Sequence, residues 1–589
     1  MSLVNYRREG TLALLQLNNP PFNAFSEALL DDFSRCLALY EQDGEAQLAV
    51  VHGQGADFSI GALAHELGVV YNSDAARPLV DAVEACAKPL IALMHGRVLG
   101  AGLELALACH WRLATATARI GVPEIHIGLP PGAGATQRLP RLIGIEPAVK
   151  MLVEGTLITA AQARDLKLVD KVLEEDWAGH FKDIADWAAM LGAPLQTRNR
   201  SHLLAQTPAN FFSEFRAAQP AEFFAYKGKS AILQAVEAID PDEFDKGYEL
   251  EERLYLEVEQ SGQKMALMNS FLHDEAAAWR TTARPDEHAP PIGAVTLSAA
   301  QLPLGCKLSV DGLQINWIKP HAMRSQTLSA LEATDVWLDC TEGPRADRLE
   351  TFASYCAAMK PGAVIVYAIR EGESVDLTQL PEQIQGHALL PAFVYGTGPK
   401  TLLQFWVRES NQSQHVQLAV RGARAIGLAC LHSPGQRLLG QEMMAGWATD
   451  LDSLLVSGVS PESITRVCQS FGLSLAAMQW SPLGSRPITE LDCPLDDDEG
   501  VLQAILCSIA NQGCRQLSAG LAMNPEDIDM LITRGYGYPP HQPGPMARWA
   551  QSVVLLHDNL AKLQSQFGES WEPAPMLKRL ARELRGATA

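Results

Sequence analysis

The chain has 589 residues, of which 47% are hydrophobic and 20% are charged, a balance typical of globular proteins with a sizeable core. That length is enough for about two to four domains. The formal net charge of −21 argues against nucleic acid or an anionic membrane surface as the main partner, although a local basic patch can still hold a small anion.

The cysteines and the chain ends add further exclusions. The 11 cysteines are scattered, with no C-x-x-C pair and no Cys/His cluster at zinc spacing, so we predict reduced thiols and no metal site. The first residues contain no apolar stretch long enough for a signal peptide, and no run approaches the roughly 20 apolar residues of a membrane span. We therefore predict a cytoplasmic protein without a nucleic-acid or membrane partner.

The first part of the chain, residues 1–190, has the pattern of a single α/β domain. Residues 11–19 (TLALLQLNN) predict a strand, and residues 20–43 turn at two prolines and continue as an amphipathic helix. Residues 46–55 predict a strand that ends in a glycine loop, and residues 81–96 predict a helix followed by another strand. Short apolar runs that alternate with helical runs indicate β-α units.

In the rest of the chain, the predicted secondary-structure pattern changes three times. Residues 191–285 read as a helical linker with charged faces, and the Pro-rich, charged segment 284–293 is the best candidate for an inter-domain connection. Residues 286–425 return to an α/β pattern, whereas residues 426–497 and 498–589 predict two helical domains. Strands are expected at 333–340 and 360–369, and a solvated break at 494–500.

The stretch VLGAGLELALACHWRLA, residues 98–114, places one carboxylate, Glu104, in an otherwise apolar run. Gly100 and Gly102 precede it, and small residues at a helix start let another group approach the backbone closely. The unpaired N–H groups there are suited to hold a negative oxygen, and each such donor is typically worth about 10²–10³ in rate when charge develops in a transition state.

A second carboxylate, Glu124, follows 20 residues later, also between apolar residues and before a Gly/Pro-rich loop. Two carboxylates in apolar surroundings can differ in pKa, so that one acts as acid and the other as base toward a water between them. The structural alternative for Glu104 is a salt bridge to Arg97, Arg112 or Arg138.

Four segments of this region resemble the crotonase (enoyl-CoA hydratase/isomerase) superfamily. They are LNNPPFNAFS (17–26), FSIGALAHEL (58–67), the long stretch 96–144 and GTLITAAQARDLKLVDKVL (155–173). The resemblance covers about residues 10–175 and is strongest to the hydratase half of bifunctional β-oxidation enzymes. It implies a crotonase fold, which is a ClpP-like ββα spiral, in residues 1–190.

The resemblance also assigns roles within this region. Glu104 and Glu124 would be the catalytic carboxylates, and the backbone N–H groups of Ala62 and Ala101 would form the oxyanion hole for the thioester oxygen. The family's usual Asp after the first oxyanion residue is Leu63 here. The backbone donor does not need that side chain, but the substrate contacts of the loop can differ. Substrate contacts near the backbone are expected at Phe22, Leu99 and Gly100.

The second half resembles the 3-hydroxyacyl-CoA dehydrogenase part of the same bifunctional enzymes. The matching segments are 334–369, 520–551 and 571–583. No G-x-G is followed by the third glycine of the dinucleotide motif, and the residues ahead of the first match are too few for a complete first β-α-β unit. The resemblance therefore implies a truncated Rossmann-like domain followed by all-helical dehydrogenase-like domains, with NAD binding lost.

Two residues mark the degenerate dehydrogenase site. His387 in HALLP stands near the family's catalytic histidine position, and Gln404 near the position of the glutamate that orients it. Because an amide cannot stabilise an imidazolium as a carboxylate does, we predict that this half is inactive and that His387 is structural.

The sequence thus predicts an enoyl-CoA hydratase that needs no cofactor besides the CoA of its substrate. The alternatives are a Δ3-Δ2 enoyl-CoA isomerase, a crotonase-type reaction on a specialised acyl thioester, and a non-catalytic acyl-CoA-binding subunit. An active hydratase/dehydrogenase is the weakest alternative. A homo-oligomer or a partner enzyme is possible, while chain length and delivery by CoA or carrier protein stay open.

Overall fold

The structure is a computed structural model in which the chain forms two compact units, Met1–Met268 and Asn269–Ala589. Within the described residues, no helix combines the length and apolarity needed to cross a bilayer. The described residues are 2–62, 73–173, 181–190, 194–278, 292–299, 313–319, 324–341, 344–370, 380–396, 401–407, 413–433, 437–473, 495, 497–550 and 552–587.

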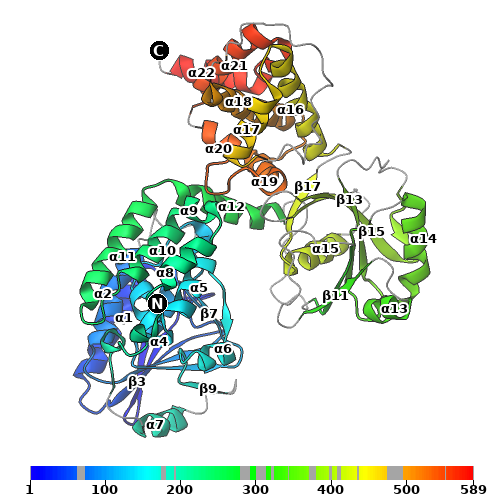
Figure 1. The fold of residues 1–589 in the computed structure, drawn as a ribbon. Coiled ribbons are helices and arrows are strands. Elements are labelled where there is room, and N and C mark those ends of the chain that lie inside the picture. Colours follow the sequence, from blue (N-terminus) through cyan, green and yellow to red (C-terminus); the bar gives the residue numbers. More distant parts are fainter. Residues whose placement is uncertain are drawn as a thin grey trace. The chain divides into compact units, whose positions relative to one another are not determined.

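The first unit, of which Figure 1 labels β3 and β9, is built on a six-stranded sheet in the order β1-β2-β3-β4-β6-β9. β1 is antiparallel to β2, and every later neighbour pair is parallel. The central strands are buried along their whole length, which explains their continuous apolar runs. The strands are β1 (Val4–Glu9), β2 (Leu12–Leu17), β3 (Leu48–Gly53), β4 (Leu90–Met94), β6 (Trp111–Thr115) and β9 (Lys171–Leu173).

A smaller sheet lies in the connections of the first and carries the candidate site. β5 (Arg97–Leu99) is parallel to β7 (Arg119–Gly121), which is antiparallel to β8 (Ile158–Thr159).

Ser26 caps the first long helix, because its side chain accepts from the backbone N–H of Leu29. The helices in this part are α1 (Glu27–Gln42), α2 (Arg77–Ala85), α3 (Ala101–Ala108), α4 (Ala135–Ile143), α5 (Ile145–Glu154), α6 (Ala160–Asp165) and α7 (Phe181–Ala189).

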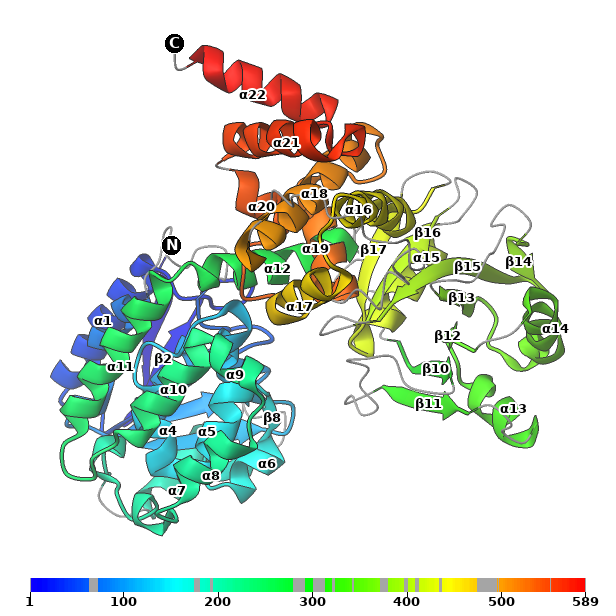
Figure 2. The same ribbon diagram turned by 45° about the horizontal axis from the view of Figure 1, so that its top comes forward.

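Most of the expected helical linker belongs to the first unit instead of bridging two units. α10 and α11 lie side by side in Figures 1 and 2, and both pack against α4. The division falls at Met268, and residues 279–291, which include most of the predicted connection 284–293, lie outside the described residues. The helices of this segment are α8 (Phe211–Ala218), α9 (Ala221–Ala225), α10 (Lys227–Glu237), α11 (Phe244–Glu259) and α12 (Gln263–Ala278).

The second unit begins with a sheet in the order β11-β10-β12-β13-β15-β16-β17. All neighbours in this order are parallel except β15 and β16, and β14 adds an antiparallel edge to β15. The strands are β10 (Ala294–Ser298), β11 (Gln314–Ile318), β12 (Val336–Asp339), β13 (Val364–Arg370), β14 (Gln383–Ile384), β15 (His387–Tyr395), β16 (Leu402–Trp406) and β17 (Ala429–Ser433).

Two sequence expectations about this sheet are wrong. The residues ahead of the first match were expected to be too few for a full first β-α-β unit, yet β10 forms parallel pairs with both β11 and β12. The helical region expected from residue 426 begins instead with β17, whose short apolar run pairs with β16 and is buried there. Tertiary pairing decides such short runs, because periodicity alone does not separate a buried strand from a buried helix.

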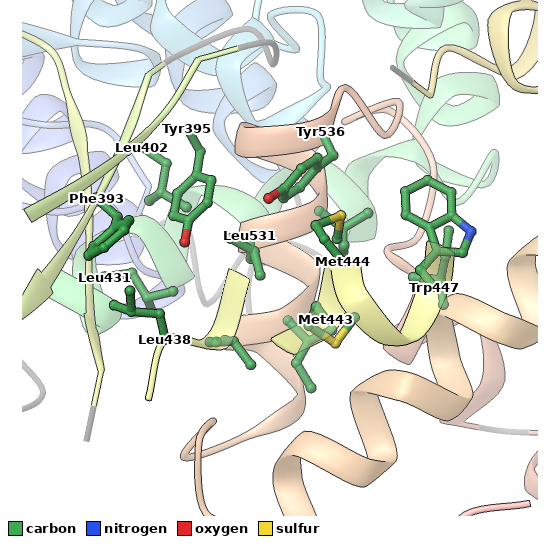
Figure 3. Packing of buried hydrophobic residues seen from close by; sticks show 14 of the residues in the cluster. Phe393, Tyr395, Leu402, Leu431, Leu438, Met443, Met444, Trp447, Leu531 and Tyr536 are labelled. Atoms are coloured by element: carbon green, nitrogen blue, oxygen red, sulfur yellow. The ribbon is translucent and has the colours of Figure 1, made fainter. Parts of the chain in front are cut away.

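The C-terminal helices share a hydrophobic core with one face of this sheet. Tyr395 and Leu402 from the sheet pack with Met444 and Trp447 of α16 and with Tyr536 of α19 (Figure 3). The helices of the second unit are α13 (Arg324–Glu332), α14 (Arg345–Tyr355), α15 (Ser413–Ala425), α16 (Leu439–Val456), α17 (Pro461–Phe471), α18 (Asp498–Ser518), α19 (Pro525–Tyr536), α20 (Pro545–Ala550), α21 (Val553–Phe567) and α22 (Pro575–Ala587).

Candidate active site

Glu104 lies within α3, a helix in which every residue is buried. The residue is only 2% exposed, and its Oε1 accepts hydrogen bonds from the backbone N–H groups of Ala133 (2.8 Å) and Ala135 (3.0 Å). Ala133 lies in the loop that leads into α4, and Ala135 is the first residue of α4. The backbone amides of another helix start therefore hold this carboxyl, which is the arrangement that a helix dipole favours.

The salt bridge weighed as the structural alternative for Glu104 is not found among the described residues. Arg97 pairs with Asp57, Arg112 pairs with Asp170, and Arg138 pairs with Glu84 and Asp81. The three candidate arginines are thus engaged elsewhere, and backbone amides take their place at Glu104.

Glu124 lies in a short 3-10 segment, Pro123–Ile127, directly after β7. Its Oε2 is buried and has no hydrogen-bond partner among the described residues. Its Oε1 faces the start of α3, because a Cβ at Gly100 would lie 2.2 Å from it. Gly100 has φ +53, so both the backbone conformation and the space at this position require glycine.

Both carboxyls hold their protons more tightly than a glutamate in water. Burial raises the pKa of Glu104, and the charges of Glu251 and Glu124 raise it further, while the amides of Ala135 and Ala133 oppose the change. Burial raises the pKa of Glu124 to about 7. A pKa near neutral pH suits a group that must both give and take a proton.

The two residues expected in the oxyanion hole come from adjoining backbone segments. Ala62 forms a bridge with Phe25, and the N–H of Phe25 donates to the carbonyl of Gly61 at 2.9 Å. Gly61 has φ +72, and a Cβ there would lie 2.9 Å from the backbone nitrogen of Ala101. Ala101 is the first residue of α3, where N–H groups lack acceptors within the helix.

The residues expected at the substrate lie around the same helix start. Leu99 ends β5, and its N–H donates to the carbonyl of Ser59 at 2.9 Å. Phe22 is partly exposed, with the guanidinium of Arg97 4.7 Å from its ring centroid. Leu63, where the sequence departs from the family pattern, lies outside the described residues.

One residue of this site was missed from the sequence. Glu251 of α11 is 1% exposed and accepts from the N–H groups of Gly134 (2.6 Å) and Thr136 (2.9 Å). Burial raises its pKa, and the donors of Thr136 and the charge of Arg77 lower it. A signal existed, because Glu251 falls on the buried stripe of α11 that contains Tyr248 and Leu254.

The two dehydrogenase-site candidates lie apart in the second unit. His387 begins β15, and its Nδ1 lies 3.0 Å from the carbonyl oxygen of Ala363. Gln404 of β16 is paired in register with Phe393 of β15. Phe393 lies six residues after His387 on β15, which corresponds to roughly 20 Å along the strand. The Oε1 of Gln404 accepts from the Tyr395 hydroxyl at 3.0 Å and from the N–H of Gly440 at 3.4 Å.

The carboxyl edge of β10, β11 and β12 contains a pocket of about 170 Å³. Asp339, at the end of β12, forms a buried ion pair there with Arg348 of α14 at 2.7 Å. The guanidinium of Arg348 also donates to the carbonyl of Ala368 and lies 3.8 Å from the Tyr367 ring centroid. The pair ties α14 to the ends of two strands at the place where doubly wound sheets bind ligands.

The first unit is similar to known proteins. Residues 7–191 match the enoyl-CoA hydratase/isomerase family model. A probable enoyl-CoA hydratase of Bacillus subtilis is 38% identical over 176 residues, which is 29% of this chain and 68% of the relative. A solved enoyl-CoA hydratase of Thermoplasma volcanium is 25% identical, with a TM-score of 0.31 over 48% of this chain and 98% of that one.

The likeness extends beyond the first unit. The peroxisomal bifunctional enzyme of Danio rerio is 26% identical in an alignment of 699 positions that covers 97% of this chain and 96% of the relative. The site around α3, the family match over the first unit and the Bacillus relative lead to one conclusion: the chain is an enzyme that belongs to the enoyl-CoA hydratase/isomerase family.

Proposed function

We propose that the chain adds water across the double bond of 2-enoyl-CoA thioesters, with Glu104 and Glu124 as its catalytic acid and base. The observation that carries the proposal is the meeting of two carboxyl groups at the start of α3. Glu104 is buried and accepts from amide donors, and Glu124 presents a buried oxygen with no hydrogen-bond partner in the described part of the chain. A pure binder of acyl-CoA has no need for two carboxyls with raised pKa values in an apolar site.

The chemistry follows from these groups. One carboxylate takes a proton from water, whose oxygen attacks the β-carbon of the enoyl group while the double-bond electrons move to the thioester oxygen. The N–H groups of Ala62 and Ala101 would hold the resulting enolate oxygen, and the other carboxyl would protonate the α-carbon. The product is a 3-hydroxyacyl thioester, so water is fully accounted for and no cofactor is required. General acid–base catalysis of this kind contributes about 10²–10⁴ in rate.

The test follows the conjugated thioester absorbance of crotonyl-CoA and longer 2-enoyl-CoAs. We expect the wild type to remove the band, and Glu104→Gln and Glu124→Gln each to slow it at least about 10²-fold. Glu146→Gln, an exposed carboxylate on α5, serves as the matched control and should keep full activity. Absence of turnover at every chain length would overturn the proposal, and conversion of a 3-enoyl-CoA alone would identify an isomerase.

For the second unit we propose a scaffold without dehydrogenase activity. The described part of the carboxyl-edge pocket supports this proposal, because its volume of about 170 Å³ is below the roughly 300–1,000 Å³ of typical ligand sites and the Asp339–Arg348 pair lines it. Lys319 follows β11, where an NAD site needs a carboxylate for the ribose. Gln404 is used in packing, away from His387.

Calorimetric titration with NADH tests this second proposal. We expect no heat of binding, and measurable binding would restore the bifunctional alternative. The cytoplasmic location and a partner enzyme or homo-oligomer stay predictions, and similar proteins include peroxisomal and glyoxysomal enzymes.

A further inference from the structure

The backbone of residues 132–136, which we name the amide strap, lies between two buried carboxyls. Glu104 accepts from the N–H groups of Ala133 and Ala135, and Glu251 accepts from those of Gly134 and Thr136. Successive amides of the strap therefore donate alternately to α3 and to α11. Displacement of either carboxyl would leave two buried N–H groups without acceptors, which is costly.

Further contacts hold the strap on the side of Glu251. The hydroxyl of Thr136 donates to Glu251 Oε2 at 2.5 Å, and the guanidinium of Arg77 lies 3.6 Å from Glu251 Oε1. Arg77 also donates to the carbonyl oxygens of Gly132 (3.3 Å) and Tyr248 (2.9 Å). Every described hydrogen bond and ion pair of the Glu251 carboxyl is thus with a donor or a cation, and these partners favour the carboxylate form against the burial that raises its pKa.

Space at the strap is equally restricted. Gly134 has φ +104, and a Cβ there would lie 1.9 Å from Nη1 of Arg138 and 3.0 Å from the ring of Tyr248. Nη1 of Arg138 in turn donates to the carbonyl oxygen of Ala133 at 3.0 Å. The strap is therefore anchored at both its N–H and its C=O groups, and α11 touches it directly.

We propose that Glu251 is a positioning residue for the hydration reaction, because its carboxylate fixes the amide strap that aims Glu104 and supplies a negative charge behind it. This inference rests on the proposed function of Glu104. It assigns a role in the active site to α11, a helix outside the segment that matches the family model. The charge would favour the protonated form of Glu104.

The experiment compares Glu251→Gln with Glu252→Gln in the full-length chain. Glu252 is the matched control, since it follows Glu251 on α11 and approaches the same Arg77 at 3.8 Å, yet its side chain is 43% exposed. In Glu251→Gln we expect kcat to fall about 10-fold or more with a smaller change in KM, since a small misplacement of a catalytic group has effects of this size. Glu252→Gln should behave as wild type.

The pH profile separates positioning from a purely structural role. Loss of the Glu251 charge should move the limb of the kcat/KM profile that reports Glu104 toward lower pH. The described groups that interact with Glu251 are Arg77 of α2, Glu104 of α3, Thr136 of α4 and Tyr248 of α11. Glu252 approaches only the shared Arg77. Of these, Glu104 is the one proposed to react. A stable Glu251→Gln enzyme whose profile matches that of Glu252→Gln would overturn the proposal.

Hydrogen exchange and a second variant test the inference without relying on enzymatic turnover. Hydrogen exchange of the 132–137 peptide should speed up in Glu251→Gln and stay unchanged in Glu252→Gln, whether or not the chain hydrates enoyl-CoA. If Glu251→Gln does not fold, Thr136→Val removes the hydroxyl that donates to Glu251 and accepts from Gln137 Nε2, and it should give a smaller change in the same direction. Unchanged exchange in every folded variant would refute the strap, while altered exchange without any wild-type hydration would refute only the proposed function.

Discussion

At the residue scale, the site depends on carboxyl groups that stay buried at some cost to stability. Glu104 accepts two amide hydrogen bonds, whereas Glu124 has a buried oxygen without a partner among the described residues. Ionising such groups is unfavourable in the folded state, because burial removes the water that would stabilise the charge. Stability and reactivity therefore oppose each other at these two positions.

The first prediction concerns how stability depends on pH. The pKa of Glu124 is raised from 4.5 to about 7, so between these values the folded state binds more protons than the unfolded state, and stability falls as pH rises. Glu124→Gln removes this dependence. We expect the Tm of the variant, relative to that of wild type, to increase from pH 4.5 to pH 8, which corresponds to a relative gain of about 3 kcal/mol.

Scanning calorimetry at several pH values measures this difference. Glu146→Gln at an exposed site should show a flat difference over the same range. A difference for Glu124→Gln that stays constant, or that decreases with pH, would contradict a raised pKa.

The second prediction concerns Gly100, where a methyl group would meet the Glu124 carboxyl. Gly100→Ala should displace Glu124 and lower the hydration rate about 10²-fold, since a displacement of about 1 Å at a reacting group has an effect of that order. Gly10→Ala is the matched control: it has a similar φ of +62, but nothing lies within 4 Å of the added Cβ. Equal activity in the two variants would show that Glu124 does not need this position.

At the element scale, helices from later parts of the chain pack against elements that come much earlier in the sequence. α11 brings Glu251 to the start of α4, and α15 covers β12 in the second unit. The second contact is close, because a Cβ at Gly422 would lie 2.7 Å from Cγ2 and 2.9 Å from Cβ of Val336. Valine is stiff at χ1, so it cannot move aside easily.

The third prediction uses this contact. Gly to Ala within a helix normally stabilises by up to about 1 kcal/mol. Gly422→Ala should instead destabilise the second unit by about 1–3 kcal/mol, because overpacking outweighs helix propensity. Adding Val336→Ala should restore part of that loss, as denaturant unfolding would show. A stabilised single variant would mean that α15 can shift without cost.

At the scale of the whole molecule, the chain combines two compact units. The first contains the candidate site, and the second continues one hydrophobic core from the sheet into the C-terminal helices. Gln404 lies at that junction, with Tyr395 and the N–H of Gly440 on its Oε1 and no partner for its Nε2 among the described residues. Its surroundings are those of a packing residue.

The fourth prediction follows from this junction. Gln404→Glu would restore the carboxylate of the dehydrogenase relatives, yet it should produce no NAD-dependent oxidation of 3-hydroxyacyl-CoA. Because a buried carboxylate lacks solvation, we expect a loss of about 1–3 kcal/mol in unfolding free energy that grows as pH rises above the ordinary carboxyl pKa. Gln383→Glu, exposed on the same sheet, should cause little change. NAD reduction by Gln404→Glu would contradict the scaffold role.

The sequence by itself determined the parts of the site whose residue types are chemically unusual in their local setting. A glutamate in the apolar run of α3 and a second one before a Gly/Pro loop identified Glu104 and Glu124, since isolated carboxylates are expensive to bury. The strands β2, β3, β12 and β13 also followed from continuous apolar runs. These features depend on the residue types of short segments, so they can be predicted from the sequence without knowledge of the tertiary contacts.

Only the tertiary structure decided which distant groups meet. Neither the amides on Glu104 nor Glu251 on the far side of the strap could be derived from spacing, because backbone N–H groups occur at every position except proline. His387 and Gln404 were paired by resemblance, whereas the strand register separates them, since one lies at the start of β15 and the other opposite Phe393. The physical reason is common to all of these: packing and register arise from long-range burial, and local sequence constrains that burial without specifying its partners.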